Sequence, residues 1–307
     1  MTEDKVNRAI KTLQSYEPEE GYYMAFSGGK DSVTLKALAD MAGVKYEAVY
    51  RVTSVDPPEL VRFIKNEHPD VIREVPRDRD GNPITMWNLI PKRMMPPTRL
   101  IRYCCSSLKE TGGDGRMTLT GVRWAESSNR KRNQGLVTIT DRTVSKQFKD
   151  NPNFQQTNRG GVVLVNDNTE SRQEVEMCYK RHKTLLNPII DWEDSDVWEF
   201  IHKNNIPYCS LYDEGFHRLG CIGCPMAMQK GREQAFARWP KYKKAYLNAF
   251  EKMLAERIRR GKTRDGWTTA TDVFNWWMEY DVLPGQYNMF EDVEEENLEI
   301  LEQDSWA

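Results

Sequence analysis

The sequence predicts an α/β protein with a doubly wound, mostly parallel sheet, helices on both faces of the sheet and a helical extension at the C-terminus. Apolar runs at 22–26, 44–52 and 71–75 alternate with amphipathic segments that have helical spacing. This alternation of strand and helix is typical of a parallel sheet. The composition becomes helical after Pro225, so we expect one domain over residues 1–225 and an extension over 226–307.

The first half of the chain gives these elements in order. Val6, Ile10 and Leu13 form the apolar stripe of an opening helix. The three strands follow, with helices between them at 33–41 and 59–68. Residues 85–95 are predicted to be helical, because Pro96 and Pro97 come next and end a helix. A further strand is expected over 117–122.

The middle of the chain, from Asn129 to about Glu174, is polar and rich in Asn, Gln, Arg and Gly. Its two apolar runs, 136–140 and 162–165, are predicted to be short strands in an excursion from the core, and a partly mobile surface loop is the alternative. The chain then returns to the core with a strand over 185–190 and a helix over 194–203.

The C-terminal extension is expected to contain one long helix. Aromatic and apolar residues from Trp239 to Met253 are three or four positions apart. Pro240 suits the first turn, and Gly261 suits the C-cap. A dense apolar group over 274–278 follows, and the tail from Glu291 is acidic and expected to fray.

Composition excludes some functions. The net charge is −2 and the pI is near 6.2, so no global basic field argues for nucleic acid. No run of about 18 apolar residues occurs, so we expect no membrane span. The first residues lack the pattern of a signal peptide. We therefore expect a cytoplasmic protein, in which thiols stay reduced, and a homo-oligomer.

The segment Ser27-Gly28-Gly29-Lys30-Asp31-Ser32 lies between the first strand and the next helix. Glycines let the backbone approach a phosphate closely, and a helix N-terminus adds positive potential. Lys30 can reach the same anion, and Asp31 suits Mg²⁺ or the helix end. The pattern is neither a Walker loop nor a dinucleotide fingerprint.

The cysteines form two pairs, the tandem Cys104-Cys105 and the C-x-x-C of Cys221 and Cys224. One zinc ion needs four ligands around a single atom, and adjacent cysteines chelate one ion poorly. A [4Fe–4S] cluster offers separate irons, so neighbouring thiolates can each bind their own. The pairs favour a cluster, with zinc, redox dithiols and inert cysteines as alternatives. The nearby cations are expected to offset cluster charge, to bind a substrate anion or to form a solvated face: Arg99, Arg102 and Lys109.

These segments resemble a known family. The glycine loop resembles the pyrophosphate loop of the adenine nucleotide α-hydrolase superfamily, which cuts ATP between the α and β phosphates. The chain is also similar to the phosphoadenosine-phosphosulfate (PAPS) and adenosine-phosphosulfate reductases over roughly residues 20–230. The segments that carry this second resemblance are Val55–Glu59, Arg102–Lys109, Thr120–Arg130, Asn187–Trp192, Asp196–Trp198, Ile206–Tyr208, Leu211–Gly215 and Gly220–Cys224.

The resemblance implies a Rossmann-like (HUP-type) fold and a set of site residues. Ser27, Gly28, Gly29, Lys30, Asp31 and Ser32 would bind the nucleotide, together with Glu59 and Glu126. Catalytic roles would fall to Lys30, Asp31, Arg123 and Arg130. The guanidinium groups of Arg123 and Arg130 suit phosphate or sulfate. A surface ion-pair network is the alternative for Arg123, Arg130 and Glu126. Trp192 and Trp198 are expected to be core residues.

Two departures from the reductases bear on the reaction. The reductases carry a catalytic cysteine near the C-terminus, whereas the last cysteine here is Cys224. They also tend to have a degenerate pyrophosphate loop, which is intact here. Both differences favour ATP as the substrate.

We therefore expect an ATP pyrophosphatase with a [4Fe–4S] cluster and Mg²⁺, which adenylylates an acceptor for sulfur transfer. Nucleic acid is a candidate acceptor, contacted by the basic segment 123–159, and a sulfur-donor protein is a candidate partner. One alternative is a sulfonucleotide reductase that uses Cys178 or Cys209 as nucleophile. Another is a non-catalytic nucleotide or cluster-binding component of a larger complex.

Overall fold

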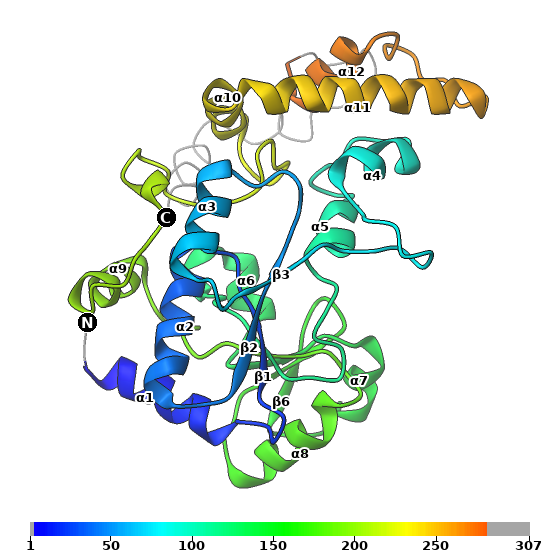
Figure 1. Cartoon of the computed structure of the whole chain (residues 1–307). Helices are drawn as coiled ribbons and strands as arrows, with labels where there is room; N and C mark the ends of the chain where they lie inside the picture. The colour runs from blue at the N-terminus through cyan, green and yellow to red at the C-terminus, as the bar shows by residue number, and fades with distance from the viewer. Residues whose placement is uncertain (1–2, 281–307) are drawn as a thin grey trace, which may run out of the picture.

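The computed structural model describes residues 3–280 and contains one sheet of eight strands in the order β3-β2-β1-β4-β8-β5-β7-β6 (Figure 1). The strands are β1 (Tyr22–Ala25), β2 (Tyr46–Arg51), β3 (Ile72–Glu74), β4 (Thr118–Leu119), β5 (Val137–Ile139), β6 (Phe154–Gln156), β7 (Val162–Leu164) and β8 (Thr184–Leu186).

The strands β3, β2, β1, β4 and β8 are all parallel, which confirms the predicted parallel sheet. Met24 of β1 pairs with Ala48 of β2 on one side and with Leu119 of β4 on the other. Met24, Ala48 and Leu119 are all buried, as expected for strands covered on both faces. The carboxyl ends of these strands therefore share one edge of the sheet, where ligands bind in open α/β folds.

The two short strands predicted in the polar middle of the chain are confirmed, but they extend the main sheet, so their placement in an excursion from the core was wrong. β5 pairs antiparallel with β8, and β7 and β6 continue the sheet in antiparallel order. Val137, Ile139 and Val162 are at most 1% exposed. Short runs of two or three apolar residues are enough here, because each strand is only three residues long.

Nine helices of the described chain precede the C-terminal extension. They are α1 (Glu3–Ser15), α2 (Lys30–Ala42), α3 (Pro58–Glu67), α4 (Met86–Arg93), α5 (Tyr103–Leu108), α6 (Ser128–Asn133), α7 (Arg142–Gln147), α8 (Thr169–Tyr179) and α9 (Asp194–Lys203). α2 packs against α1 and α9, and α8 packs against β8, so the sheet is covered on both faces (Figure 1). Trp192 is buried and Trp198 is partly buried against the core, as predicted.

Four of these helices, α5 to α8, were not predicted from the sequence, although three of them carry capping signals. The Ser127 hydroxyl accepts a hydrogen bond from the Arg130 amide at the start of α6. Asp141 accepts a hydrogen bond from the Thr143 amide at the start of α7, and Asn168 forms a capping box with Ser171 at the start of α8. α5 has no side-chain cap, and it carries Cys104 and Cys105.

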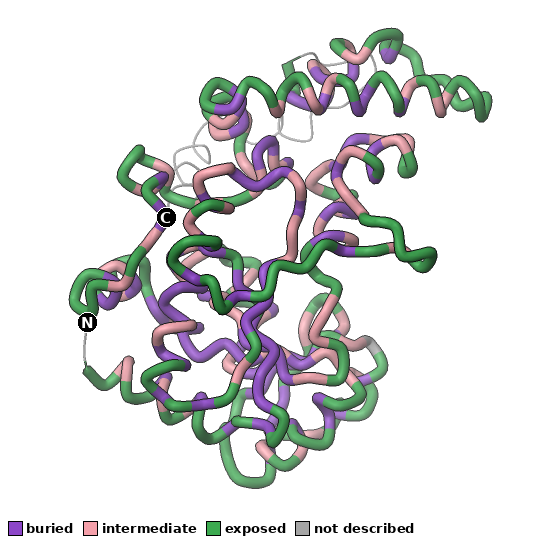
Figure 2. The backbone as a smooth tube through the Cα atoms, in the orientation of Figure 1, coloured by how far each residue is buried: buried purple, intermediate pink, exposed green. Residues whose placement is uncertain are grey.

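Helices α10 (Gln229–Arg238), α11 (Pro240–Arg259) and α12 (Ala270–Trp277) form the C-terminal part of the described chain. Pro240 occupies the first turn of α11, and Gly261 follows its C-cap with φ +63°. The three helices lie across the carboxyl edge of the sheet, and α11 packs against α4 (Figure 1). Their inner side is buried and their outer side is exposed (Figure 2).

The tail predicted to be acidic and frayed, from Glu291, lies outside the described residues. No helix within residues 3–280 combines the length and the apolar character that a bilayer crossing requires.

Candidate functional site

The glycine loop lies at the carboxyl end of β1 and leads directly into α2, which begins at Lys30. Gly28 has φ +73°, and a Cβ at this position would lie 2.7 Å from Cγ1 of Ile64 in α3. Only glycine fits both constraints. The Ser32 hydroxyl donates to the Gly29 carbonyl (2.8 Å) and closes the turn. The loop is thus a tight turn that leads into the N-terminus of a helix.

Lys30 is buried at this helix N-terminus. Its side chain is 7% exposed, and its Nζ lies 3.3 Å from Oδ1 of Asp194. Its backbone N–H donates to the Tyr212 hydroxyl (2.9 Å). Asp194 begins α9 and Tyr212 ends a short 3₁₀ turn (Ser210–Tyr212), so two distant segments meet at Lys30.

Arg123 is almost fully buried, with 1% exposure. Its Nε donates to Oδ1 of Asp31 (2.7 Å), one terminal nitrogen donates to Asp194 (2.5 Å) and the other to the Trp192 carbonyl (3.1 Å). Burial opposes its charge, but Asp31 and Asp194 raise the pKa of Arg123. The guanidinium group is therefore engaged, which favours a positioning role over direct contact with phosphate.

The charges at Lys30 and Arg123 balance those at Asp31 and Asp194. One oxygen of Asp31 accepts from Arg123, and the other lies 3.9 Å from Nζ of Lys30. A magnesium ion would find no uncompensated carboxylate in this arrangement. The residues present therefore do not fit the predicted Mg²⁺ role of Asp31.

Arg130 and Glu126 form a separate pair. Arg130 donates to Glu126, which also accepts from the Arg123 backbone N–H (3.1 Å). The side chain of Arg130 is 29% exposed and, within residues 3–280, has Glu126 as its only side-chain partner. Of these two arginines, Arg130 is the one with access to a ligand.

Glu59 lies at the start of α3 and faces the C-terminal helices. It accepts hydrogen bonds from Trp239 Nε1 (3.0 Å) and Arg238 (3.2 Å). This fastens α3 to the junction of α10 and α11. Its predicted role in nucleotide binding stays a prediction.

The two cysteine pairs meet beside the carboxyl end of β2. The Cys221 thiol lies 3.8 Å from Asp56 and 3.9 Å from Thr53, and the Ile222 N–H donates to the Val55 carbonyl (2.8 Å). The pKa of the Cys104 thiol is raised, first by its hydrogen bond with Cys105, then by burial and by the charges of the other thiolates. The pKa of Cys104 is thus affected by Cys221 and Cys224 of the other pair.

Three cations surround these thiols. Arg102 donates to the Cys105 sulfur (3.2 Å). The Cys221 thiolate, followed by Asp56, raises the pKa of Lys109 although burial opposes this. Arg99 donates to the Pro225 carbonyl (3.1 Å) and so ties the two cysteine segments together. Positive charge beside several thiolates is the environment that an anionic cluster needs.

The four paired thiols are the candidate ligands of a cluster. Within residues 3–280, no three His, Cys, Asp or Glu side chains gather closely enough to hold one metal ion. In a four-iron cluster each thiolate binds its own iron, so the four thiolates lie farther apart than the ligands of a single metal ion do. Binding of a cluster by Cys104, Cys105, Cys221 and Cys224 stays a prediction.

Gly223 allows the C-x-x-C turn to fit beneath the C-terminal helices. It has φ +70°, and a Cβ would lie 2.7 Å from Cζ of Phe236 and 3.0 Å from Trp277. Tyr246 of α11 donates to the Ile222 carbonyl (3.0 Å). The helical extension thus shapes the loop that carries two of the four thiols.

Cys178 and Cys209 are isolated, buried cysteines. Cys178 is 4% exposed and Cys209 is 1% exposed, and burial raises the pKa of both thiols. A buried thiol with a raised pKa is a poor nucleophile. This geometry disfavours a reductase mechanism that uses either residue.

Sequence reasoning missed four residues of the site: Asp194, Tyr212, Thr53 and Asp56. Asp56 is buried and accepts from the Tyr50 hydroxyl (2.5 Å), beside Cys221. Nothing in the local sequence near Asp194 indicates that it meets Lys30. The segments Val55–Glu59 and Leu211–Gly215, by contrast, carry the family resemblance, and that signal leads to Asp56 and Tyr212.

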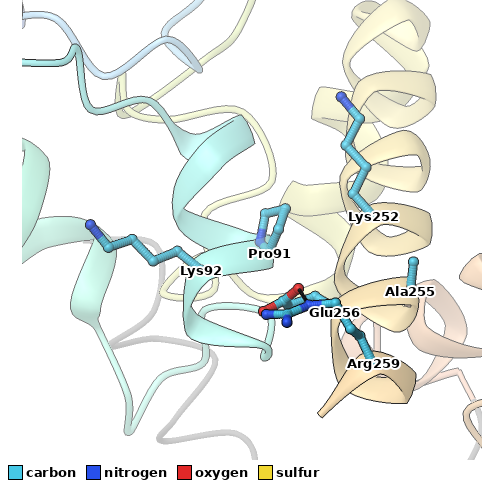
Figure 3. A pocket seen from close by; sticks show the side chains of 6 residues that line it. All are labelled: Pro91, Lys92, Lys252, Ala255, Glu256 and Arg259. Atoms are coloured by element: carbon cyan, nitrogen blue, oxygen red, sulfur yellow. Dashed lines mark hydrogen bonds and ion pairs between the residues drawn. The ribbon is translucent and has the colours of Figure 1, made fainter.

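Two cavities lie outside this arrangement. One, of about 370 Å³, lies between α4 and α11 and is lined by Lys92, Lys252 and the paired Glu256 and Arg259 (Figure 3). It contains none of the predicted site residues. The other, of about 770 Å³, is lined by residues of β2, β3 and α5.

Known proteins share parts of this chain. An uncharacterised protein of Methanocaldococcus jannaschii is 37% identical over 252 residues, which cover 78% of this chain and 48% of that protein. The adenosine 5′-phosphosulfate reductase of Neisseria meningitidis is 43% identical over 53 residues, 17% of this chain and 22% of the enzyme. The chain thus spans less than half the length of either relative.

Among solved structures, the PAPS reductase of Candida auris overlaps with 72% of this chain and 96% of its own, at 12% identity and a TM-score of 0.37. A family model described as the phosphoadenosine phosphosulfate reductase domain matches residues 21–227, which include the glycine loop and both cysteine pairs. The chain belongs to the phosphoadenosine phosphosulfate reductase domain family.

Proposed function

We propose that this protein is an ATP pyrophosphatase that adenylylates an acceptor for sulfur transfer. In this reaction an acceptor oxygen attacks the α-phosphorus of ATP, the bond from that phosphorus to the α–β bridging oxygen breaks, and pyrophosphate leaves. A sulfur nucleophile from a donor then displaces AMP from the acceptor. The observation that supports the proposal is the intact glycine loop, which leads from β1 into α2 with Lys30 buried at the helix N-terminus.

The roles of the loop residues follow from charge. Negative charge builds on the leaving pyrophosphate, and preorganised donors directed at such charge are usually the largest catalytic contribution. The amides of the loop and the ammonium of Lys30 supply those donors. Arg123 holds Asp31 and Asp194 in place, and these carboxylates in turn orient Lys30.

Cys104, Cys105, Cys221 and Cys224 would hold a [4Fe–4S] cluster in this proposal. When bound, the cluster would supply a place to hold or relay sulfur. Arg102 and Lys109 lie against the cysteine sulfurs and would offset its negative charge. Nucleic acid is the proposed acceptor class. Of the basic segment 123–159, Arg123 is buried and cannot form part of a contact surface, whereas Lys131, Arg132, Lys146, Lys149 and Arg159 are exposed.

The test is pyrophosphate release from ATP by the anaerobically purified chain, with candidate nucleic acids as acceptors. We expect Lys30→Ala to lower the rate at least about 100-fold, as for the loss of a transition-state donor. Lys36→Ala is the matched control, because Lys36 lies on the same helix and pairs with Asp40 and Asp70. Equal rates for Lys30→Ala and the unchanged protein would refute the proposal. So would sulfite release from a sulfonucleotide with no pyrophosphate from ATP.

A further inference from the structure

The larger cavity, of about 770 Å³, lies where β2 and β3 end. Arg51 and Glu74 are the last residues of these strands, and the segment that follows β3 contributes Arg77 and Arg79. Ser106 and Ser107 of α5 line the same cavity. Its volume lies within the usual range for small-molecule sites. It also lies at the sheet edge where α/β folds bind ligands.

The cavity has an excess of positive charge. Its lining contains three arginines and one carboxylate. Glu74 is already paired with Arg51 (2.6 Å). The one hydrogen bond of the Arg77 guanidinium goes to the Gly81 carbonyl (2.7 Å), and Arg79 has no hydrogen-bond or ion-pair partner among residues 3–280. The positive charges of Arg77 and Arg79 thus have no carboxylate partner among the described residues. Two such guanidinium groups in one cavity suit a phosphate, because a guanidinium group can donate two parallel hydrogen bonds to its oxygens.

Arg51 is the fixed part of this site. Its side chain is 11% exposed and is held by Glu74 on one side and by Thr111 on the other. Its Nε is buried and has no hydrogen-bond partner among the described residues. Buried donors are normally satisfied, so an unpaired one in the wall of a basic cavity suggests a missing acceptor.

The cavity adjoins the four thiols through two elements. Ser106 and Ser107 directly follow Cys105 in α5. Arg51 ends β2, and the residues after it, Thr53 and Asp56, lie against Cys221. The glycine loop follows β1, the strand next to β2. The glycine loop, the cysteine site and this basic cavity therefore all lie near the carboxyl ends of the neighbouring strands β1, β2 and β3.

We propose that this cavity binds a phosphate group of the acceptor. This inference rests on the proposed function, because it assumes that an acceptor meets ATP beside the thiols. The phosphate belongs either to a small phosphorylated molecule or to a nucleic-acid strand, since both present the same oxygens. Arg77 and Arg79 bind it, and Arg51 fixes the wall of the cavity.

The test compares two double variants that remove the same charge. Arg77→Ala/Arg79→Ala removes the free cations of the cavity, and both side chains are exposed, so the fold should persist. Arg8→Ala/Arg181→Ala removes two exposed arginines elsewhere and is the control. The probes are inorganic phosphate, ribose 5-phosphate and a short 5′-phosphorylated RNA. Binding is measured by calorimetry and fluorescence anisotropy at ~0.15 M salt, where surface charge is largely screened.

We expect the cavity variant to bind its preferred probe at least about tenfold more weakly, while the control pair binds like the unchanged protein. A loss seen with ribose 5-phosphate assigns the site to small phosphorylated acceptors, and a loss seen with RNA alone assigns it to nucleic acid. If the unchanged protein binds none of the probes, or both variants lose affinity equally, the proposal is overturned.

Measuring pyrophosphate release distinguishes failure of the proposed function from failure of the proposed phosphate site. With water in place of the acceptor as nucleophile, the cavity variant should release pyrophosphate and AMP from ATP at the same rate as the unchanged protein, because Lys30 and the glycine loop are intact. If ATP is never cleaved but the arginine-dependent binding is found, the proposed function fails and the phosphate site stands. If ATP is cleaved and the binding is absent, the phosphate site fails alone.

Discussion

Asp31 and Arg123, which are 92 residues apart in the sequence, form an ion pair with Nε of Arg123 2.7 Å from Oδ1 of Asp31. The pair joins the first turn of α2 to the segment after β4. Gly121 makes this approach possible, because a Cβ there would lie 3.0 Å from the Asp31 carbonyl. The nucleotide loop and the arginine segment are therefore one unit.

Replacement of Arg123 by Met should destabilise the protein. Asp31 and Asp194 would lose their shared partner, and removing one member of a buried ion pair is costly. Because Asp194 is half exposed, we expect a loss of about 2 kcal/mol in the free energy of unfolding, measured by urea denaturation. Arg130→Met, which breaks only the more exposed pair with Glu126, should cost less than about 1 kcal/mol. Equal losses would contradict the positioning role.

The same cluster predicts a dependence of stability on pH. Burial raises the pKa of Asp194, but Lys30 and then Arg123 outweigh it, so the folded-state pKa lies below the ordinary 3.8. The stabilisation is therefore complete above this value and is lost as the pH falls through the lowered pKa. Asp194→Asn should flatten the acid side of a plot of urea midpoint against pH. Asp114→Asn, in an exposed loop, should leave the plot unchanged.

Gly223→Ala should destabilise the C-x-x-C turn. The new Cβ would meet Phe236 at 2.7 Å in a backbone conformation with φ +70°. Overpacking and the left-handed backbone together should cost about 2–3 kcal/mol. Gly261→Ala is the matched control, because its φ is +63° but the space around it is open. It should cost only about 1 kcal/mol in the same urea denaturation. A Gly223→Ala protein no less stable than Gly261→Ala would show that the aromatic contacts are not tight.

Iron content separates the two classes of cysteine. After anaerobic purification, single changes to Ser at Cys104, Cys105, Cys221 or Cys224 should remove most iron, sulfide and visible absorbance. Cys178→Ser and Cys209→Ser should retain them, since both thiols are buried and neither belongs to a cysteine pair. An unchanged protein that contains no iron or sulfide, or iron that survives the loss of the paired thiols, would refute the cluster.

The parallel half of the fold could be predicted because its strands are continuous in the sequence. Tyr22–Phe26 and the run at 44–52 are apolar enough to indicate buried strands without any partner. β6 was missed because Phe154-Gln155-Gln156 has one apolar side chain and becomes a strand only by pairing with β7. The register and partner of such a strand depend on tertiary contacts that no local pattern contains.

The candidate site divides in the same way. The loop from Ser27 to Ser32 is contiguous, so its local geometry follows from six residues. The surroundings of Lys30 cannot be predicted from these six residues, because Asp194 and Tyr212 belong to elements that meet Lys30 only in the folded chain. Arg123 is an example. Its guanidinium group could bind a phosphate, but in the folded protein it is already paired with the carboxylates of Asp31 and Asp194, which the sequence does not indicate.

Helices beyond the family match brace both thiol-bearing segments, since Tyr246 bonds to Ile222 and Trp277 bonds to the Pro97 carbonyl at 2.7 Å. A chimera that keeps residues 21–227 but exchanges the rest should therefore change how readily the thiols are oxidised, although every thiol is still present.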